Sequence, residues 1–140
     1  MMQLDNLYQE VILDHYKNPQ NKNLESDNDA QVHHVNPSCG DEVTLGVKLD
    51  GEKILSINWE GVGCSISQAS TSIMSDLLIG RTLAEAHEIS ENFLHLMQSK
   101  GAEKGDPEVL EDAVALAGVS QYPARIKCAL LGWMAFKDAS

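Results

Sequence analysis

The sequence has few basic residues and no apolar run long enough to cross a membrane. Its 140 residues contain 10 Lys and Arg against 21 Asp and Glu, a formal net charge of -11. Binding to nucleic acid or to anionic lipid needs a basic face, so we expect neither interaction. An acidic chain suits a partner with a basic docking surface. A membrane-spanning helix needs about 20 consecutive apolar residues, and the sequence offers none.

Cysteines are also few, and the start of the sequence lacks the features of a secretory signal peptide. The first residues include no basic segment followed by an apolar run. The three cysteines are an odd number and form no Cys-x-x-Cys pair. We therefore expect a cytoplasmic protein whose thiols stay reduced. Its cysteines are then metal ligands, reactive thiols or buried packing residues.

The first half of the sequence predicts a small β-sheet. Apolar and polar residues alternate over residues 43–49 and again over 55–59, and Asp50-Gly51 between them is a hairpin signal. A shorter strand is expected at residues 31–35. Together these segments predict a three-stranded antiparallel meander with one apolar face, on which Leu55, Ile57 and Trp59 are expected.

Helical patterns occupy most of the remaining sequence. They cover residues 4–16, 65–79, 82–100, 107–117 and the segment that begins at Pro123. Thr82-x-x-Glu85 has the form of a capping box, and Gly118 is expected to end the fourth helix. Strands early and helices late predict one α+β domain over residues 1–140, with the sheet packed against about five helices.

Cys64 follows Gly61-Val62-Gly63, where the last strand runs into a helix. A thiol at a helix N-terminus lies among unpaired backbone N–H groups, which favour a thiolate. The two glycines allow positive φ angles and a close approach of the backbone to a ligand. The alternative is an ordinary strand-to-helix turn in which the cysteine is merely small.

Cys39 and Asp41 lie in a turn formed by Pro37 and Gly40. Residues two apart in extended backbone point the same way, so a thiolate and a carboxylate here could form half of a metal site. Alternatively, Asp41 caps the turn and Cys39 packs beneath it.

Cys128 lies near the start of the last helix, between cationic residues and Ala129, and could equally be a buried packing residue. Three thiolates and the Asp41 carboxylate would suit tetrahedral zinc. Among the histidines, we interpret His15 as a cation at a helix C-terminus.

Four motifs make the sequence recognisable. They are Asp14-His15-Tyr16-x-Asn18-Pro19, Cys39-Gly40-Asp41, Gly61-x-Gly63-Cys64-x-Ile66-Ser67-x-Ala69-Ser70 and Pro123-x-Arg125-x-Lys127-Cys128-Ala129. In this order the chain resembles the IscU-like iron–sulfur cluster assembly family, and in particular its SufU branch. Lys127 stands where the IscU scaffold has a histidine, and residues 101–121 resemble a stretch added in the SufU branch. Arg125 also matches the SufU pattern.

The resemblance implies an α+β fold and one zinc ion held by Cys39, Asp41, Cys64 and Cys128. It implies a zinc-dependent sulfurtransferase in which Cys39 accepts persulfide sulfur from a pyridoxal-phosphate cysteine desulfurase of the SufS type. In the family picture the desulfurase supplies a replacement zinc ligand, and Arg125 matches a residue associated with this step. Downstream iron–sulfur assembly proteins would take the sulfur.

Two other readings stay open. The same cysteines could hold a transient [2Fe–2S] cluster, as on an IscU-like scaffold. Lys127 argues against this reading, because imidazole would ligate and a lysine ammonium would not. Alternatively, the zinc could be purely structural.

Overall fold

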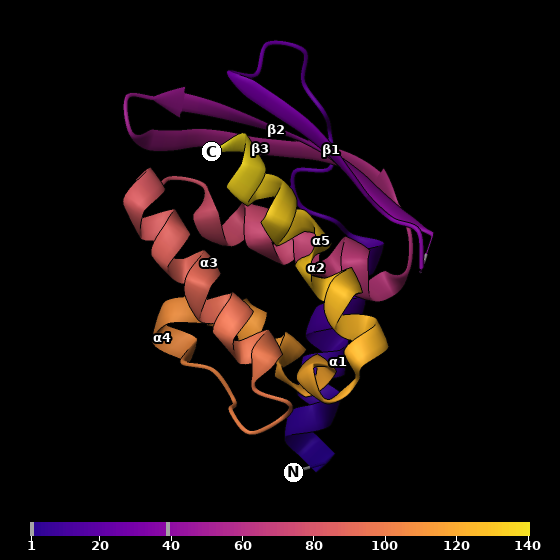
Figure 1. The fold of residues 1–140 in the computed structure, drawn as a ribbon. Coiled ribbons are helices and arrows are strands. Elements are labelled where there is room, and N and C mark those ends of the chain that lie inside the picture. The colour runs from indigo at the N-terminus through magenta and orange to yellow at the C-terminus, as the bar shows by residue number, and fades with distance from the viewer. Residues whose placement is uncertain (1, 39) are drawn as a thin grey trace.

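The predicted α+β architecture is confirmed. The computed structural model describes residues 2–38 and 40–140, with side chains described from residue 9 onward in those ranges. A three-stranded sheet lies along one side of the molecule and the helices lie together beneath it (Figure 1). The elements in chain order are α1 (Met2–Lys17), β1 (Ala30–Asn36), β2 (Asp41–Asp50), β3 (Lys53–Val62), α2 (Ser65–Leu78), α3 (Leu83–Gln98), α4 (Pro107–Leu110), the 3₁₀ helix η1 (Glu111–Gln121) and α5 (Pro123–Ala139).

The sheet is the predicted meander. Its order is β1-β2-β3, and both neighbouring pairs are antiparallel. Asp50 pairs with Lys53, so the hairpin turn is formed by Gly51 and Glu52, one residue later than the Asp50-Gly51 signal indicates. Gly51 has φ +62°, a conformation that glycine adopts without strain.

The prediction that Leu55 faces the core is wrong. A bulge between Lys48 and Leu49 shifts the β2–β3 register, and Leu55 is 54% exposed while Ile54 and Ile57 are buried. A bulge adds one residue to one strand and breaks the alternation of faces at that point. Strict alternation along β3 therefore placed Leu55 on the wrong face.

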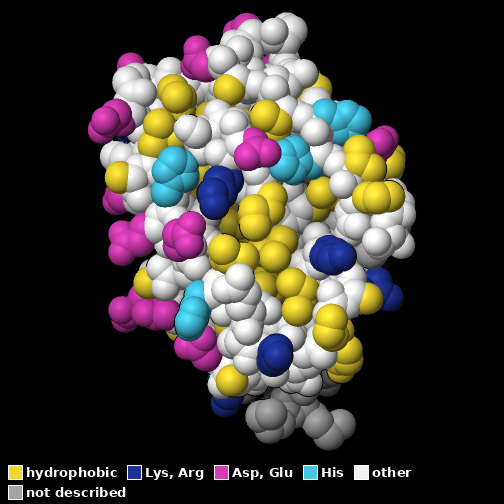
Figure 2. Space-filling view, viewed as in Figure 1, with side chains coloured by type: hydrophobic (Ala, Val, Ile, Leu, Met, Phe, Trp, Pro, Cys, Tyr) yellow, Lys and Arg dark blue, Asp and Glu magenta, His cyan; other side chains and the backbone are white. Residues whose placement is uncertain are grey.

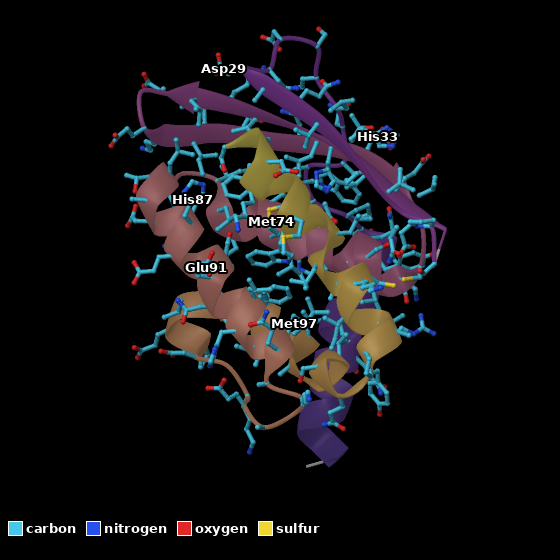
Figure 3. All side chains as sticks on the ribbon, viewed as in Figure 1. Asp29, His33, Met74, His87, Glu91 and Met97 are labelled. Atoms are coloured by element: carbon cyan, nitrogen blue, oxygen red, sulfur yellow. The ribbon has the colours of Figure 1, made fainter. Side chains whose placement is uncertain are left out.

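The apolar face of the sheet packs on α2 and α5. α5 contacts β1 and β2, and α2 contacts β3. The two helices are joined by a polar link, because Ser70 donates to the Ala129 carbonyl (2.6 Å) and accepts the Trp133 indole N–H (3.0 Å). Trp133 stacks on Phe93 of α3 with ring centroids 4.1 Å apart. These contacts fix α5 on α2, and Figure 3 shows Met74 and Met97 in the interior among the helices.

The segment after α3 differs from the helix predicted over residues 107–117. α4 stops after four residues at Glu111, which has φ +47°, and η1 continues through Gly118 to Gln121. Leu110, Ala113, Leu116 and Val119 are buried at a spacing of three, and Ala115, Ala117 and Ser120 are buried as well. Residues three apart are eclipsed in a 3₁₀ helix, so the first four form one buried row in the tighter helix, and the other three are buried beside it.

His15 lies in the last turn of α1, at the helix C-terminus where the sequence places it. It is buried, its Nδ1 lies 2.8 Å from Ser72 Oγ of α2, and its Nε2 lies 3.7 Å from Asp112 of η1. Ser72 Oγ also accepts the backbone N–H of Gln20 (2.7 Å). His15 therefore connects α1 to α2 and to the segment 101–121, which is part of the helical layer.

The predicted capping box of α3 is present. The Thr82 hydroxyl accepts the backbone N–H of Glu85, and the Glu85 carboxylate accepts the backbone N–H of Thr82. The backbone hydrogen bond from Thr82, followed by the one from its hydroxyl, holds the pKa of Glu85 below its ordinary value.

Acidic side chains gather on the α3 side of the molecule (Figure 2). Figure 3 labels two residues of α3: Glu91 is exposed, whereas the ring of His87 packs against Phe136 of α5 with centroids 5.9 Å apart. Among the helices of the described residues, none has the length and apolar character that crossing a bilayer would require.

Candidate metal centre

Three of the four predicted ligands come together at one end of the sheet. One ligand atom from each of Asp41, Cys64 and Cys128 lies within 4.8 Å of the other two. Asp41 begins β2, Cys64 immediately precedes α2, and Cys128 lies in the second turn of α5. The fourth, Cys39, lies outside the described residues, so its part in the site stays a prediction.

Asp41 is the centre of this cluster. Its side chain is fully buried, its Oδ1 accepts the backbone N–H of Cys64 (2.8 Å), and its Oδ2 lies 3.8 Å from Cys64 Sγ. The carboxylate therefore sits at the N-terminus of α2, where the helix dipole favours a negative charge. This hydrogen bond fixes the start of β2 against the start of α2.

Gly63 gives Asp41 the space for this position. It has φ +152°, and a Cβ added to it would lie 2.2 Å from Asp41 Oδ1 and 2.8 Å from Ser67 Oγ. Gly61 has a different role, since a Cβ there would lie 2.5 Å from the backbone oxygen of Glu42. The two glycines therefore allow close approach between the end of β3 and the start of β2. The approach of this backbone to a ligand, which the sequence indicates, stays a prediction.

Cys128 is placed by the packing of α5. Its side chain is buried, and its Sγ lies 3.8 Å from the Ala124 carbonyl one turn earlier. Ala129 receives the hydrogen bond from Ser70 of α2, so the residue next to Cys128 is tied to the helix that Cys64 begins. Contacts between α2 and α5 therefore set the distance between the two thiols.

Gly132→Ala is expected to disturb this spacing. A Cβ at residue 132 would lie 2.4 Å from Thr71 Oγ1 and 3.0 Å from both Thr71 Cβ and Cγ2, so rotation of Thr71 gives no relief. Overpacking costs roughly 1–3 kcal/mol, against about 1 kcal/mol gained when alanine replaces glycine in a helix.

We expect a lower melting temperature and weaker metal binding, both partly restored by adding Thr71→Ala. Thermal unfolding and metal titration would measure this. A Gly132→Ala variant with unchanged metal affinity would show that the α2–α5 distance does not control the cluster.

The cationic residues beside Cys128 point away from the interior. Arg125 and Lys127 are both exposed in the first turns of α5. Neither belongs to the group of possible metal ligands in the described residues. Arg125 is thus accessible to another molecule one turn from Cys128.

Sequence reasoning missed one polar residue beside the site. Asn36 ends β1, is buried, and is paired with Asp41 in the register of β1 and β2. Nothing in the local pattern marks it, because asparagine before proline is an ordinary turn signal.

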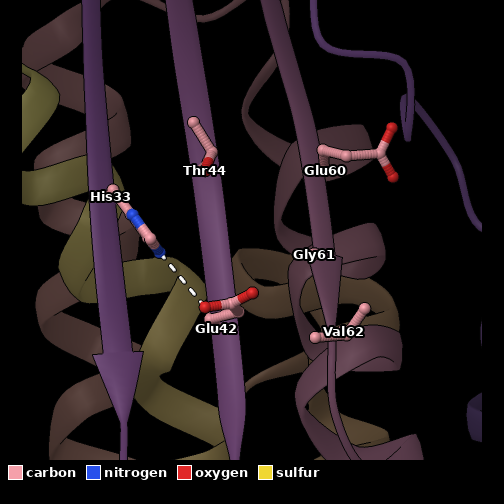
Figure 4. Close-up of a pocket in the computed structure, with 6 residues that line it drawn as sticks. All are labelled: His33, Glu42, Thr44, Glu60, Gly61 and Val62. Carbon is pink, nitrogen blue, oxygen red and sulfur yellow. Dashed lines mark ion pairs between the residues drawn. The ribbon is translucent and has the colours of Figure 1, made fainter.

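A separate shallow pocket lies on the outward face of the sheet. It is lined by His33, Glu42, Thr44, Glu60, Gly61 and Val62, and His33 Nε2 lies 3.5 Å from Glu42 Oε2 (Figure 4). Glu42 and Asp41 are adjacent and face opposite sides of the sheet, since Glu42 is exposed and Asp41 is buried. The pocket is therefore distinct from the cluster.

The donor set of the cluster fits zinc. Two sulfurs and one carboxylate oxygen are ligands that zinc accepts, at distances of about 2.0–2.3 Å. Ligand atoms around a tetrahedral zinc are about 3.3–3.8 Å apart. The three ligand atoms here lie within 4.8 Å of one another, so small side-chain rotations would bring them to the distances that zinc requires. Three protein ligands leave one tetrahedral position for a fourth.

The sequence is similar to those of several known proteins. The NifU-like N terminal domain family matches residues 7–129. The chain is 47% identical to the "Zinc-dependent sulfurtransferase SufU" of Bacillus subtilis (strain 168), over 96% of this chain and 89% of that protein. It is 40% identical to the "Iron-sulfur cluster assembly scaffold protein IscU" of Streptococcus pyogenes serotype M1, over 99% of this chain and 86% of that protein.

A solved structure shares the fold. The crystal structure of the "Putative iron-sulfur cluster assembly scaffold protein for SUF system (FiSufU)" of Fervidobacterium islandicum AW-1 superposes with a TM-score of 0.85 at 38% identity, and the match covers 93% of each chain. The family match spans the described cluster from Asp41 to Cys128. The chain belongs to the family of NifU-like N-terminal domains.

Proposed function

We propose that this protein is a zinc-dependent sulfur-transfer protein of iron–sulfur cluster assembly. The observation that carries the proposal is the convergence of Asp41, Cys64 and Cys128 from three distant segments. The relative from Bacillus subtilis is named a zinc-dependent sulfurtransferase, which supports zinc as the metal. Cys39 would be the fourth ligand, two residues before Asp41 in sequence.

In this proposal Cys39 is the sulfur acceptor. The cysteine persulfide of a cysteine desulfurase presents its outer sulfur, and the Cys39 thiolate attacks it. A new S–S bond forms on Cys39, the S–S bond on the desulfurase breaks, and the desulfurase cysteine leaves as a thiolate. Bound zinc would keep the thiols deprotonated at neutral pH without itself changing oxidation state.

The other residues have positioning roles. Asp41 and Cys64 would stay on the metal because the hydrogen bond between them anchors both to α2. The exposed Arg125 would contact the desulfurase during transfer, and downstream iron–sulfur assembly proteins would remove the sulfur.

The second candidate is a scaffold for a [2Fe–2S] cluster, because the relative from Streptococcus pyogenes carries that name. Lys127 favours sulfur transfer over this role, since a lysine beside Cys128 supplies no cluster ligand at neutral pH.

Metal analysis of the purified protein, combined with a desulfurase rate assay, tests the proposal. We expect about one zinc per chain, a colourless protein, and faster alanine production by a SufS-type desulfurase. A brown protein that transfers an intact cluster would support the scaffold. If the protein contains zinc but does not change the desulfurase rate, the metal has a purely structural role.

Arg125→Ala is expected to separate zinc binding from partner contact. The side chain is exposed and outside the cluster, so zinc content should stay at the level of the unaltered protein. Stimulation of the desulfurase should fall, with a higher concentration of the variant needed for half-maximal rate. The exposed Lys137 at the other end of α5 provides the control Lys137→Ala, which should change neither quantity. Loss of zinc from Arg125→Ala would contradict the partner role.

A further inference from the structure

Asn36 carries a buried amide whose donor is unused. The residue is 7% exposed, and its Nδ2 has no hydrogen-bond partner among the described residues. Buried polar groups almost always have partners, and an unpaired buried donor is costly. We therefore expect a hydrogen-bond acceptor for the Asn36 Nδ2 group in the functional state of the protein.

The sheet contains a matched residue for comparison. Asn58 is 3% exposed, and both ends of its amide are used. Its Oδ1 accepts the backbone N–H of Glu25 (2.9 Å), and its Nδ2 donates to Asn28 Oδ1 (2.8 Å) and Ser56 Oγ (3.1 Å). Asn58 is thus a satisfied structural amide, and Asn36 is not.

The strand register places Asn36 beside the metal cluster. It is paired with Asp41, and both residues are buried. Directly opposed residues of an antiparallel pair project to the same face, with Cβ atoms about 5 Å apart. The Asp41 carboxylate can accept up to about four hydrogen bonds, and the backbone N–H of Cys64 uses one of these positions.

We propose that Asn36 is a positioning residue of the metal site, acting through Asp41. The inference rests on the proposed zinc binding. In the zinc-loaded protein the Asn36 amide donates to the Asp41 carboxylate. The amide and the Cys64 N–H then share this carboxylate and leave one of its oxygens for the metal. Carboxylates that bind metals are held by such outer hydrogen bonds, and losing one weakens metal binding about 10–100-fold.

Two substitutions separate this role from packing. Asn36→Ala removes the donor and leaves space, and Asn36→Leu removes the donor but keeps the volume. Both should raise the zinc dissociation constant about 10-fold in chelator competition, and both should shift the visible absorption of the cobalt-substituted protein. Asn36→Leu should not lower the melting temperature of the protein stripped of metal, because an unpaired buried donor has been removed.

The matched control is Asn58→Ala. This substitution should lower the melting temperature, because the hydrogen-bond partners of the Asn58 amide lose their bonds. It should leave zinc affinity unchanged. In the unaltered protein, the side-chain amide protons of Asn36 should shift in NMR spectra when zinc is added, and those of Asn58 should not.

A double-mutant cycle identifies the acceptor. In an Asp41→Ala background, Asn36→Ala should have no further effect on zinc affinity. An equal effect in both backgrounds would show that the amide does not act through Asp41, and unchanged affinity in both Asn36 variants would overturn the proposal outright. If the unaltered protein binds no zinc, the proposed function itself fails, so the two failures are distinguishable.

Discussion

Cys39→Ala is expected to abolish stimulation of a cysteine desulfurase. Alanine offers no nucleophile for the outer sulfur of the persulfide, so the transfer has no acceptor. Asp41, Cys64 and Cys128 remain as three ligands, a number that holds zinc in many catalytic sites. The variant should therefore still contain zinc, bound more weakly than in the unaltered protein.

The measurements are zinc per chain and the rate of alanine formation by the desulfurase. Ser38→Ala is the matched control, because Ser38 is exposed and adjacent, and it should stimulate as the unaltered protein does. After incubation with desulfurase and cysteine, mass spectrometry should find an added sulfur on Cys39. Stimulation by Cys39→Ala at the level of the unaltered protein would exclude Cys39 as the acceptor.

Gly63→Ala is expected to remove most of the metal affinity. The new Cβ would lie 2.2 Å from Asp41 Oδ1 and 2.8 Å from Asp41 Cγ, so the carboxylate must leave its position. The hydrogen bond from the Cys64 N–H would then be lost, and with it the alignment of two ligands. We expect zinc affinity to fall on the order of 100-fold, together with a lower melting temperature.

Gly80→Ala is the control for backbone strain alone. Gly80 lies just beyond the other end of α2 and also has a positive φ (+89°), but a Cβ there would have no atom within 4 Å. Its substitution should cost about 1–2 kcal/mol of stability and leave zinc binding intact. Equal zinc loss in the two variants would mean that general destabilisation, and not displacement of Asp41, empties the site.

Sequence reasoning predicted those parts of the fold that local patterns control. The alternation along β2 and the Asp50-Gly51 signal were sufficient to predict the hairpin, and the capping box was sufficient to predict the start of α3. Leu55 was misplaced because a bulge changes the register without any local mark in the sequence. The helix 107–117 was misassigned because apolar residues at a spacing of three suit a 3₁₀ helix, whereas glycine at 118 suggested an ordinary helix end.

At the site, the sequence indicated which residues could be ligands but not which residues contact one another. Thiols and a carboxylate at the ends of strands and helices are recognisable as possible ligands from residue type and position alone. The bond from Cys64 to Asp41 joins segments 23 residues apart, and His15 meets Ser72 across 57 residues, so neither follows from spacing. Asn36 went unnoticed for the same reason, since its pairing with Asp41 depends on the register of β1 and β2.

The pairing of Asn36 with Asp41 limits how far the proposed acceptor can travel. The four residues between them close a hairpin whose two ends are both held in the sheet. Consecutive Cα atoms are 3.8 Å apart, so the Cα of Cys39 stays within about 8 Å of the Cα of Asp41 in any loop conformation. A sulfur carrier on so short a tether cannot swing between two distant enzymes. In the proposed transfer, each donor and each recipient would therefore bring its own reactive atom to this end of the sheet, and because they would need the same place, they would bind in turn.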